Sequence, residues 1–118
     1  MGNFQATDDL LGGDVRVLRV AGDVDFDVAP TFKRRITGFI EAGDRQLIVE
    51  LSAVDFIDST AIGVLVGAIK RMRAAGGSLV VVCDNDEVRG IFEAVGLESV
   101  IPLHHSHEDA FVALAVAA

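Results

Sequence analysis

The chain contains 118 residues, 51% of them hydrophobic, and carries a formal net charge of −8. This length and composition predict one globular domain, spanning residues 1–118, with an ordinary hydrophobic core. The negative charge argues against binding to nucleic acid or to an anionic membrane surface, because both depend on clusters of Lys and Arg.

The first predicted element is a hairpin. Residues 15–21 (VRVLRVA) alternate apolar and charged side chains, which is typical of a strand with one solvent-exposed face. Gly12-Gly13 favours a turn, so Phe4–Thr7 is expected to form a short partner strand.

Helices and strands alternate through the rest of the chain. The apolar spacing changes between helical periodicity and continuous short runs, and Gly residues follow the helical segments. The first predicted helix covers about Val28–Ala42, is capped by Asp27 and is followed by a buried strand at 46–51. The second runs from Thr60 to the stop at Gly76-Gly77 and is followed by a buried strand at Leu79–Cys83. A third helix is capped by Asp86 and ended by Gly96, at most a short edge strand follows at 99–103, and a last helix begins after a capping box at Ser106.

The order ββαβαβα(β)α predicts the α/β fold class. We expect a mixed β-sheet of about four or five strands with helices packed against it and right-handed crossovers. No internal repeat, linker or low-complexity segment divides the sequence.

Most sequence patterns of catalytic sites are absent. No GxxxxGK[ST], GxGxxG or GxSxG motif occurs, so neither a nucleotide loop nor a catalytic serine elbow is predicted, and no cofactor is expected. His104, His105 and His107 cluster, but adjacent histidines diverge, so a solvated loop is a simpler interpretation than a metal site. Cys83, the single cysteine, excludes an intrachain disulfide and is expected to be a small buried hydrophobe.

The N-terminus lacks the basic and apolar regions of a signal peptide. No apolar stretch reaches the ~18 residues of a membrane span. Since nothing contradicts a reducing cytosol, we expect a cytoplasmic protein.

Three aspartates, Asp23, Asp25 and Asp27, alternate in the predicted loop GDVDFDVAP. The pattern resembles the start of an EF-hand loop, but Val28 stands where the glycine is required, so calcium is not expected. Two interpretations remain open: a solvated acidic loop with a capping Asp, and a docking surface for a basic partner.

Gly63 and Gly67 lie four residues apart on one face of a predicted helix. Each costs about 1 kcal/mol relative to Ala, so we expect them to permit close packing on a neighbouring element. The short apolar run and the following Lys70 and Arg71 exclude a membrane dimer motif.

The stretch DFIDSTAIG at 55–63 joins a buried strand to a helix and places Ser59 beside Thr60. Both residue types are favoured at helix N-caps, and a purely structural role is the simpler interpretation. However, sites in open α/β sheets form where strands end and helices begin. A phosphate is also tolerated at a helix N-terminus, so a hydroxyl here could be modified with the fold intact.

The same stretch carries a family resemblance. DFIDSTAIGVLV resembles the central motif of the anti-sigma factor antagonists (anti-anti-sigma factors) of the STAS domain fold, Asp-Ser-Ser/Thr-Gly-hydrophobic-Gly. VAGDVDFDVAP is similar to the Gly-Glu-hydrophobic-Asp loop of that family, and VRGIFEAVGLESVIPLHHSHEDAFVAL resembles its C-terminal third. The resemblance covers nearly the whole chain in the same order.

The resemblance implies a regulatory protein and not an enzyme, so no catalytic residue is expected. In that family an anti-sigma factor, itself an ATP-dependent kinase, phosphorylates the serine after the aspartate, which is Ser59 here. The unphosphorylated member binds the kinase and frees a sigma factor, and a phosphatase resets the phosphorylated one. The partner-binding residues that the resemblance implies are Asp23, Asp25, Asp58, Thr60, Ile62 and Gly63.

One position departs from the family motif, because Ala61 stands where Gly is frequent. Ala would be strained at positive φ but is favourable in the first turn of a helix. We expect the second case, since the apolar stripe begins at Ile62.

Two other classes of function compete with this hypothesis. One is a STAS scaffold subunit, of a signalling assembly or a lipid-transport system, that is never phosphorylated; the Asp58-Ser59 pair speaks against it. The other is a small α/β enzyme that uses Ser59, for which no His lies near in sequence. The protein is expected to be a monomer or a weak dimer.

Overall fold

The structure, a computed structural model, describes residues 3–97 and 99–117. Five strands form one sheet in the order β1-β2-β3-β4-β5. The strands are β1 (Gln5–Leu11), β2 (Val15–Val24), β3 (Gln46–Ile57), β4 (Ser78–Val82) and β5 (Leu103–His104). The helices are α1 (Ala29–Glu41), α2 (Ser59–Ala74), α3 (Asp86–Ala94) and α4 (His107–Ala117).

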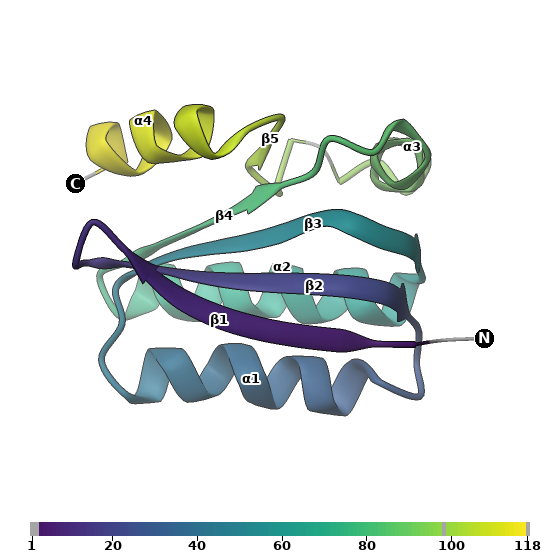
Figure 1. Cartoon of the computed structure of the whole chain (residues 1–118), viewed down its shortest axis with the longest axis horizontal. Helices are drawn as coiled ribbons and strands as arrows, with labels where there is room; N and C mark the ends of the chain where they lie inside the picture. The colour runs from purple at the N-terminus through teal and green to yellow at the C-terminus, as the bar shows by residue number, and fades with distance from the viewer. Residues whose placement is uncertain (1–2, 98, 118) are drawn as a thin grey trace.

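The predicted α/β class and mixed sheet are confirmed. β1 pairs with β2 in antiparallel orientation, as expected of the hairpin, and β2 through β5 are parallel. β5 is a two-residue strand at the edge of the sheet, as expected, but it lies at Leu103–His104 and shares only Leu103 with the predicted range 99–103. Because α1 and α2 connect successive parallel strands, both run back along the sheet in the same direction (Figure 1).

Helices cover both faces of the sheet. Figure 1 shows α1 and α2 side by side on one face and α4 on the other. The larger apolar cluster joins Leu47, Val49 and Val81 to the inner sides of α1 and α2, and the smaller one joins Ile48 and Val80 to α4. Neighbouring residues of β3 therefore point into opposite clusters, which explains its continuous apolar sequence.

Several element boundaries differ from those that the sequence predicted. β1 ends four residues later than expected, β2 continues to Val24, and β3 continues to Ile57. Asn85, and not Asp86, caps α3, since its side chain accepts hydrogen bonds from the main-chain N–H groups of Glu87 and Val88. The capping role of Ser106 is confirmed by the hydrogen bond from the N–H of Asp109.

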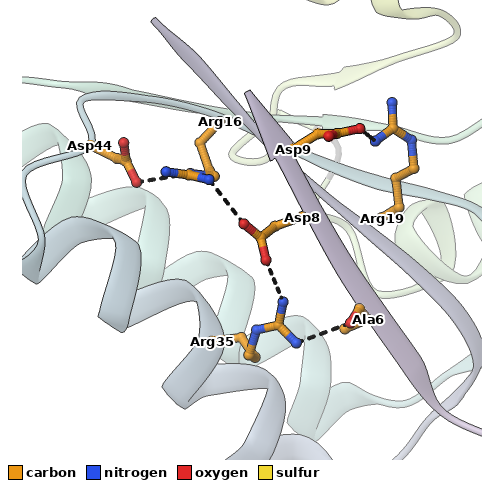
Figure 2. Close-up of polar contacts among 7 residues, drawn as sticks. All are labelled: Ala6, Asp8, Asp9, Arg16, Arg19, Arg35 and Asp44. Carbon is orange, nitrogen blue, oxygen red and sulfur yellow. Dashed lines mark hydrogen bonds and ion pairs between the residues drawn. The ribbon is translucent and has the colours of Figure 1, made fainter. Parts of the chain in front are cut away.

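A network of ion pairs holds the hairpin against α1 (Figure 2). The Asp8 carboxylate accepts from Arg16 at 2.9 Å and from Arg35 of α1 at 3.0 Å. Arg16 also donates to Asp44 at 3.1 Å, and Arg35 donates to the carbonyl oxygen of Ala6 at 3.0 Å. One carboxylate thus links β1, β2 and α1.

Candidate functional site: the surface around the start of helix α2

Asp58, and not Ser59 or Thr60, is the N-cap of α2. Its backbone is extended, with φ −102° and ψ 175°, and its carboxylate accepts a hydrogen bond from the N–H of Ala61 at 3.0 Å. Its own N–H donates to the carbonyl oxygen of Val24, which fixes the start of α2 to the end of β2. The interpretation of Ser59 as a cap is therefore wrong.

Ser59 is the first residue of α2 and is exposed to solvent. Its hydroxyl makes no hydrogen bond to any residue that the structure describes. Thr60 beside it is also exposed. Because Asp58 caps the helix, the Ser59 hydroxyl is not needed to satisfy the N–H of Ala61.

Asp25 organises the loop before α1, a task predicted for Asp27. The Asp25 carboxylate accepts from the N–H groups of Asp27 at 3.0 Å and Val28 at 3.3 Å. Val28 is the N-cap residue of α1 and provides no side-chain hydrogen bond, because a valine has no acceptor. The expected cap at Asp27 is wrong, and the Asx-type turn at Asp25 replaces it.

A β-bulge shapes the end of β3. Gly22 pairs with Val54 but Asp23 pairs with Phe56, so Asp55 is an extra residue on the β3 side. The bulge lets Val54 and Ile57 both enter the core while Asp55 and Phe56 stay exposed.

Two phenylalanines at this end of the sheet are exposed, and the sequence did not single them out. Phe26, in the loop after β2, is 66% exposed, and Phe56, near the end of β3, is 46% exposed. Both lie at the end of the sheet where α2 begins, since Phe56 pairs with Asp23 near the end of β2 and Phe26 follows that strand. The signal in the sequence was a Phe between two aspartates, in DFD and again in DFID.

The other predicted site residues divide into surface and core. Asp23 lies within β2 and is half-buried, whereas it was expected in a loop. Gly63 is exposed, but Ile62 is only 1% exposed and packs in the main apolar cluster. The side chain of Ile62 therefore anchors α2 to the core and is not available to a partner.

Ala61 is fully buried in the first turn of α2. Its φ is not positive, since Asn3 is the one described residue other than Gly with a positive φ. The expectation that Ala is compatible with this position is confirmed.

The close-packing interpretation of Gly63 and Gly67 is wrong. A Cβ added to either residue would meet no atom within 4 Å, apart from the immediate helix backbone. Both glycines line an open groove between α1 and α2.

The residues with reactive side chains do not converge on Ser59. His107 contacts Glu50, with 2.6 Å between Nε2 and Oε2, and His105 faces Asp84 at 3.8 Å. Burial raises the pKa of the Cys83 thiol, as expected of a small core residue. Among the described residues, no group of three His, Cys, Asp or Glu side chains could hold a metal ion. None of the helices in that part of the chain has the length and apolar character of a bilayer span.

Comparisons with known proteins place the chain in a family. The model of the STAS domain matches residues 11–110. The anti-sigma-B factor antagonist of Bacillus subtilis is 30% identical over 95 residues, which cover 80% of this chain and 85% of that protein. The chain therefore belongs to the STAS domain family, and within it to the anti-sigma factor antagonists.

Solved structures agree in fold. An anti-sigma factor antagonist from Mycobacterium paratuberculosis superposes with a TM-score of 0.86 at 24% identity, covering 96% of this chain and 95% of that one. The Bacillus cell fate determinant SpoIIAA in its phosphorylated form has a TM-score of 0.69 at 19% identity, covering 92% of this chain and 98% of that one. At these identities the two structures support the fold alone.

Proposed function

We propose that this anti-sigma factor antagonist is switched by phosphorylation of Ser59. The unphosphorylated form binds an anti-sigma factor kinase and so releases a sigma factor. Phosphorylation of Ser59 by that kinase ends the binding, and a phosphatase that acts on phosphoserine restores it. The chain is a substrate of both enzymes and has no activity of its own.

The observation that carries the proposal is the free hydroxyl of Ser59. It is exposed at the start of a helix, while Asp58 satisfies the N–H group that a serine cap would have served. A phosphate on Ser59 would break no hydrogen bond of the described chain and would meet the favourable end of the helix dipole. The modification is therefore compatible with a folded protein that is recognised differently.

The surroundings of Ser59 explain how a phosphate would end binding. The carboxylates of Asp23 and Asp55 form no ion pair or hydrogen bond within the described residues, and Asp58 adjoins the modified position. A partner that meets this surface needs cations for the aspartates and an apolar recess for Phe26 or Phe56. Phosphoserine would add about −1.5 to −2 charges where the partner is shaped for a neutral hydroxyl.

The acceptor is tested by phosphorylation with the anti-sigma factor kinases of the source organism, each purified and incubated singly with the chain and ATP. Intact mass should show one added phosphate on the wild-type chain and on Thr60→Ala, but none on Ser59→Ala. A phosphate that persists on Ser59→Ala and disappears from Thr60→Ala would move the switch to Thr60. No phosphate with any kinase would favour the scaffold hypothesis.

The binding switch is tested with the same kinases by titration. Ser59→Ala should bind like the wild type, whereas Ser59→Asp should bind about tenfold more weakly or worse, since about 1.4 kcal/mol corresponds to tenfold and mismatched charge at an interface costs several times that. Ser59→Asp should remain folded, because a carboxylate suits the first turn of a helix. Equal affinity of Ser59→Asp and wild type would contradict the proposal.

A further inference from the structure

The charge of the molecule is divided between its layers. Helices α1 and α2 contain six of the ten Lys and Arg residues but only one of the eighteen Asp and Glu residues. They carry a formal charge of +5, so the remainder of the chain carries −13. The net charge thus conceals a basic layer, which Figure 1 shows as two adjacent helices on one face of the sheet.

A groove of about 440 Å³ runs along this layer between the two helices. Lys33 and Thr37 border it on α1, and Thr60, Gly63, Gly67 and Arg71 border it on α2. From Thr60 to Arg71 the groove follows α2 for roughly 16 Å, at the helical rise of about 1.5 Å per residue. Arg71 forms an ion pair with Glu41, whereas Lys33 forms none with any described residue.

No close contact among the described residues requires a glycine at the two glycine positions of the groove. Gly63 and Gly67 are exposed, have no positive φ, and leave space for a Cβ. Helix interiors disfavour glycine relative to alanine, so the two residues weaken α2 without a steric reason within the chain. What they do provide is depth, because a larger side chain at either position would project into the groove.

We infer that this groove binds an acidic segment of the partner protein that also contacts Ser59. The inference rests on the proposed function and extends it to a second contact of opposite charge. Continuity supports it, since Thr60 borders the groove and directly follows Ser59. Charge complementarity supports an acidic segment, and the backbone of Gly63 and Gly67 with Val64 and Ala68 offers it an apolar floor.

The aspartates near the groove make a protein segment a better ligand for it than an extended polyanion such as DNA or an anionic membrane. A DNA duplex or an anionic membrane that reached Lys33 would also face the unpaired carboxylates around Ser59, at the same end of the molecule. A folded protein can instead present a basic patch to those aspartates and an acidic segment to the groove. The expected partner interface is therefore of mixed charge, and this pattern fixes the orientation of binding.

The experiment titrates the purified anti-sigma factor kinase that binds the wild-type chain against four variants of the full chain. Lys33→Glu and Gly67→Leu change the groove, and each should raise the Kd about fivefold or more. Lys70→Glu changes the same charge on α2 outside the groove, and Gly38→Leu changes an exposed glycine of α1 that also has space for a Cβ. Both controls should stay within about twofold of the wild type. None of the four should lower the temperature of thermal unfolding, and the two glycine variants should raise it, because helix interiors disfavour glycine.

Ser59→Asp in the same titration separates this inference from the proposed function. If Ser59→Asp weakens binding while Lys33→Glu and Gly67→Leu bind like the wild type, the groove inference is wrong and the switch stands. If Ser59→Asp binds like the wild type, the proposed switch is wrong, and the groove variants still report whether the groove is used. Equal losses in groove variants and controls would also overturn the groove. So would wild-type binding to phosphatidylglycerol vesicles or a DNA duplex that Lys33→Glu abolishes while kinase binding is unchanged.

Discussion

The two ends of the sheet use the same residue types in opposite ways. Where β3 and β4 begin, two charged residues bond within the chain: Asp44 pairs with Arg16, and Arg45 donates to the carbonyl oxygens of Ile40 and Asp44. Where β2 and β3 end, Asp23 and Asp55 have no cation among the described residues, and Phe26 and Phe56 are exposed.

The difference separates residues that serve the fold from residues that are free to bind. Substitution of a paired carboxylate or of a tightly packed glycine lowers the stability of the protein, because the contacts that are lost lie within the chain. Substitution of an unpaired carboxylate breaks no contact within the described chain, so it is expected to change partner binding and not stability. Each end therefore predicts its own pattern of mutational effects.

Gly77→Ala should have the largest effect, at the end where β4 begins. A Cβ at Gly77 would lie 2.4 Å from the carbonyl oxygen of Arg45 and 2.7 Å from Sδ of Met72. The backbone must shift to accept it, which should lower the free energy of unfolding by about 1–3 kcal/mol. Chemical denaturation measures the loss, and Gly38→Ala, which has open space, should raise stability instead. An unchanged stability of Gly77→Ala would mean that this end is loosely packed.

Asp58→Ala should have an intermediate effect, because Asp58 serves both fold and site. Loss of its hydrogen bond to the N–H of Ala61 should cost about 1 kcal/mol of stability. Asp58→Asn keeps an acceptor and should recover most of that loss. Ser59→Ala should change stability by less than about 0.5 kcal/mol, since its hydroxyl is unbonded. A larger loss in Ser59→Ala than in Asp58→Ala would return the capping role to Ser59.

Periodicity, together with the glycines between segments, was sufficient to predict the order of elements. VRVLRVA and QLIVEL are both strands, as predicted. The expected solvent-exposed face of VRVLRVA is wrong, because Val15 and Val17 pack in the cluster with α4 while Leu18 and Val20 pack in the main cluster. The boundaries near the site were not predictable, because the bulge at Asp55 depends on pairing with a strand more than thirty residues earlier in the chain. The sequence of DFID, taken alone, has no alternation that would extend the strand to Ile57.

The sequence predicted where the site lies, but not the structural role of each residue in it. Asp58, Ser59 and Thr60 are all good capping residues, so the pattern cannot decide which of them begins the helix. The basic groove was hidden because net charge sums over a chain that the fold divides into layers. The exposed phenylalanines were hidden because a single apolar residue in a loop can also be an anchor to the core.

The variants with the smallest expected effect on stability allow the most direct comparison, because the same change, Asp to Asn, is made at both ends of the sheet. Asp8→Asn breaks ion pairs to Arg16 and Arg35, and we expect it to lower stability by up to about 1 kcal/mol and to leave kinase binding unchanged. Asp23→Asn with Asp55→Asn breaks no contact within the described chain, so its stability should stay within about 0.5 kcal/mol of the wild type. It should nevertheless slow association with the kinase at low salt and flatten the dependence of the rate on ionic strength, because exposed charges act mainly on encounter. Stopped-flow association at two salt concentrations, with denaturation of both variants, measures the contrast. If Asp8→Asn slows association as much as the double variant does, the acidic surface is not local to Ser59, and the division between the two ends fails.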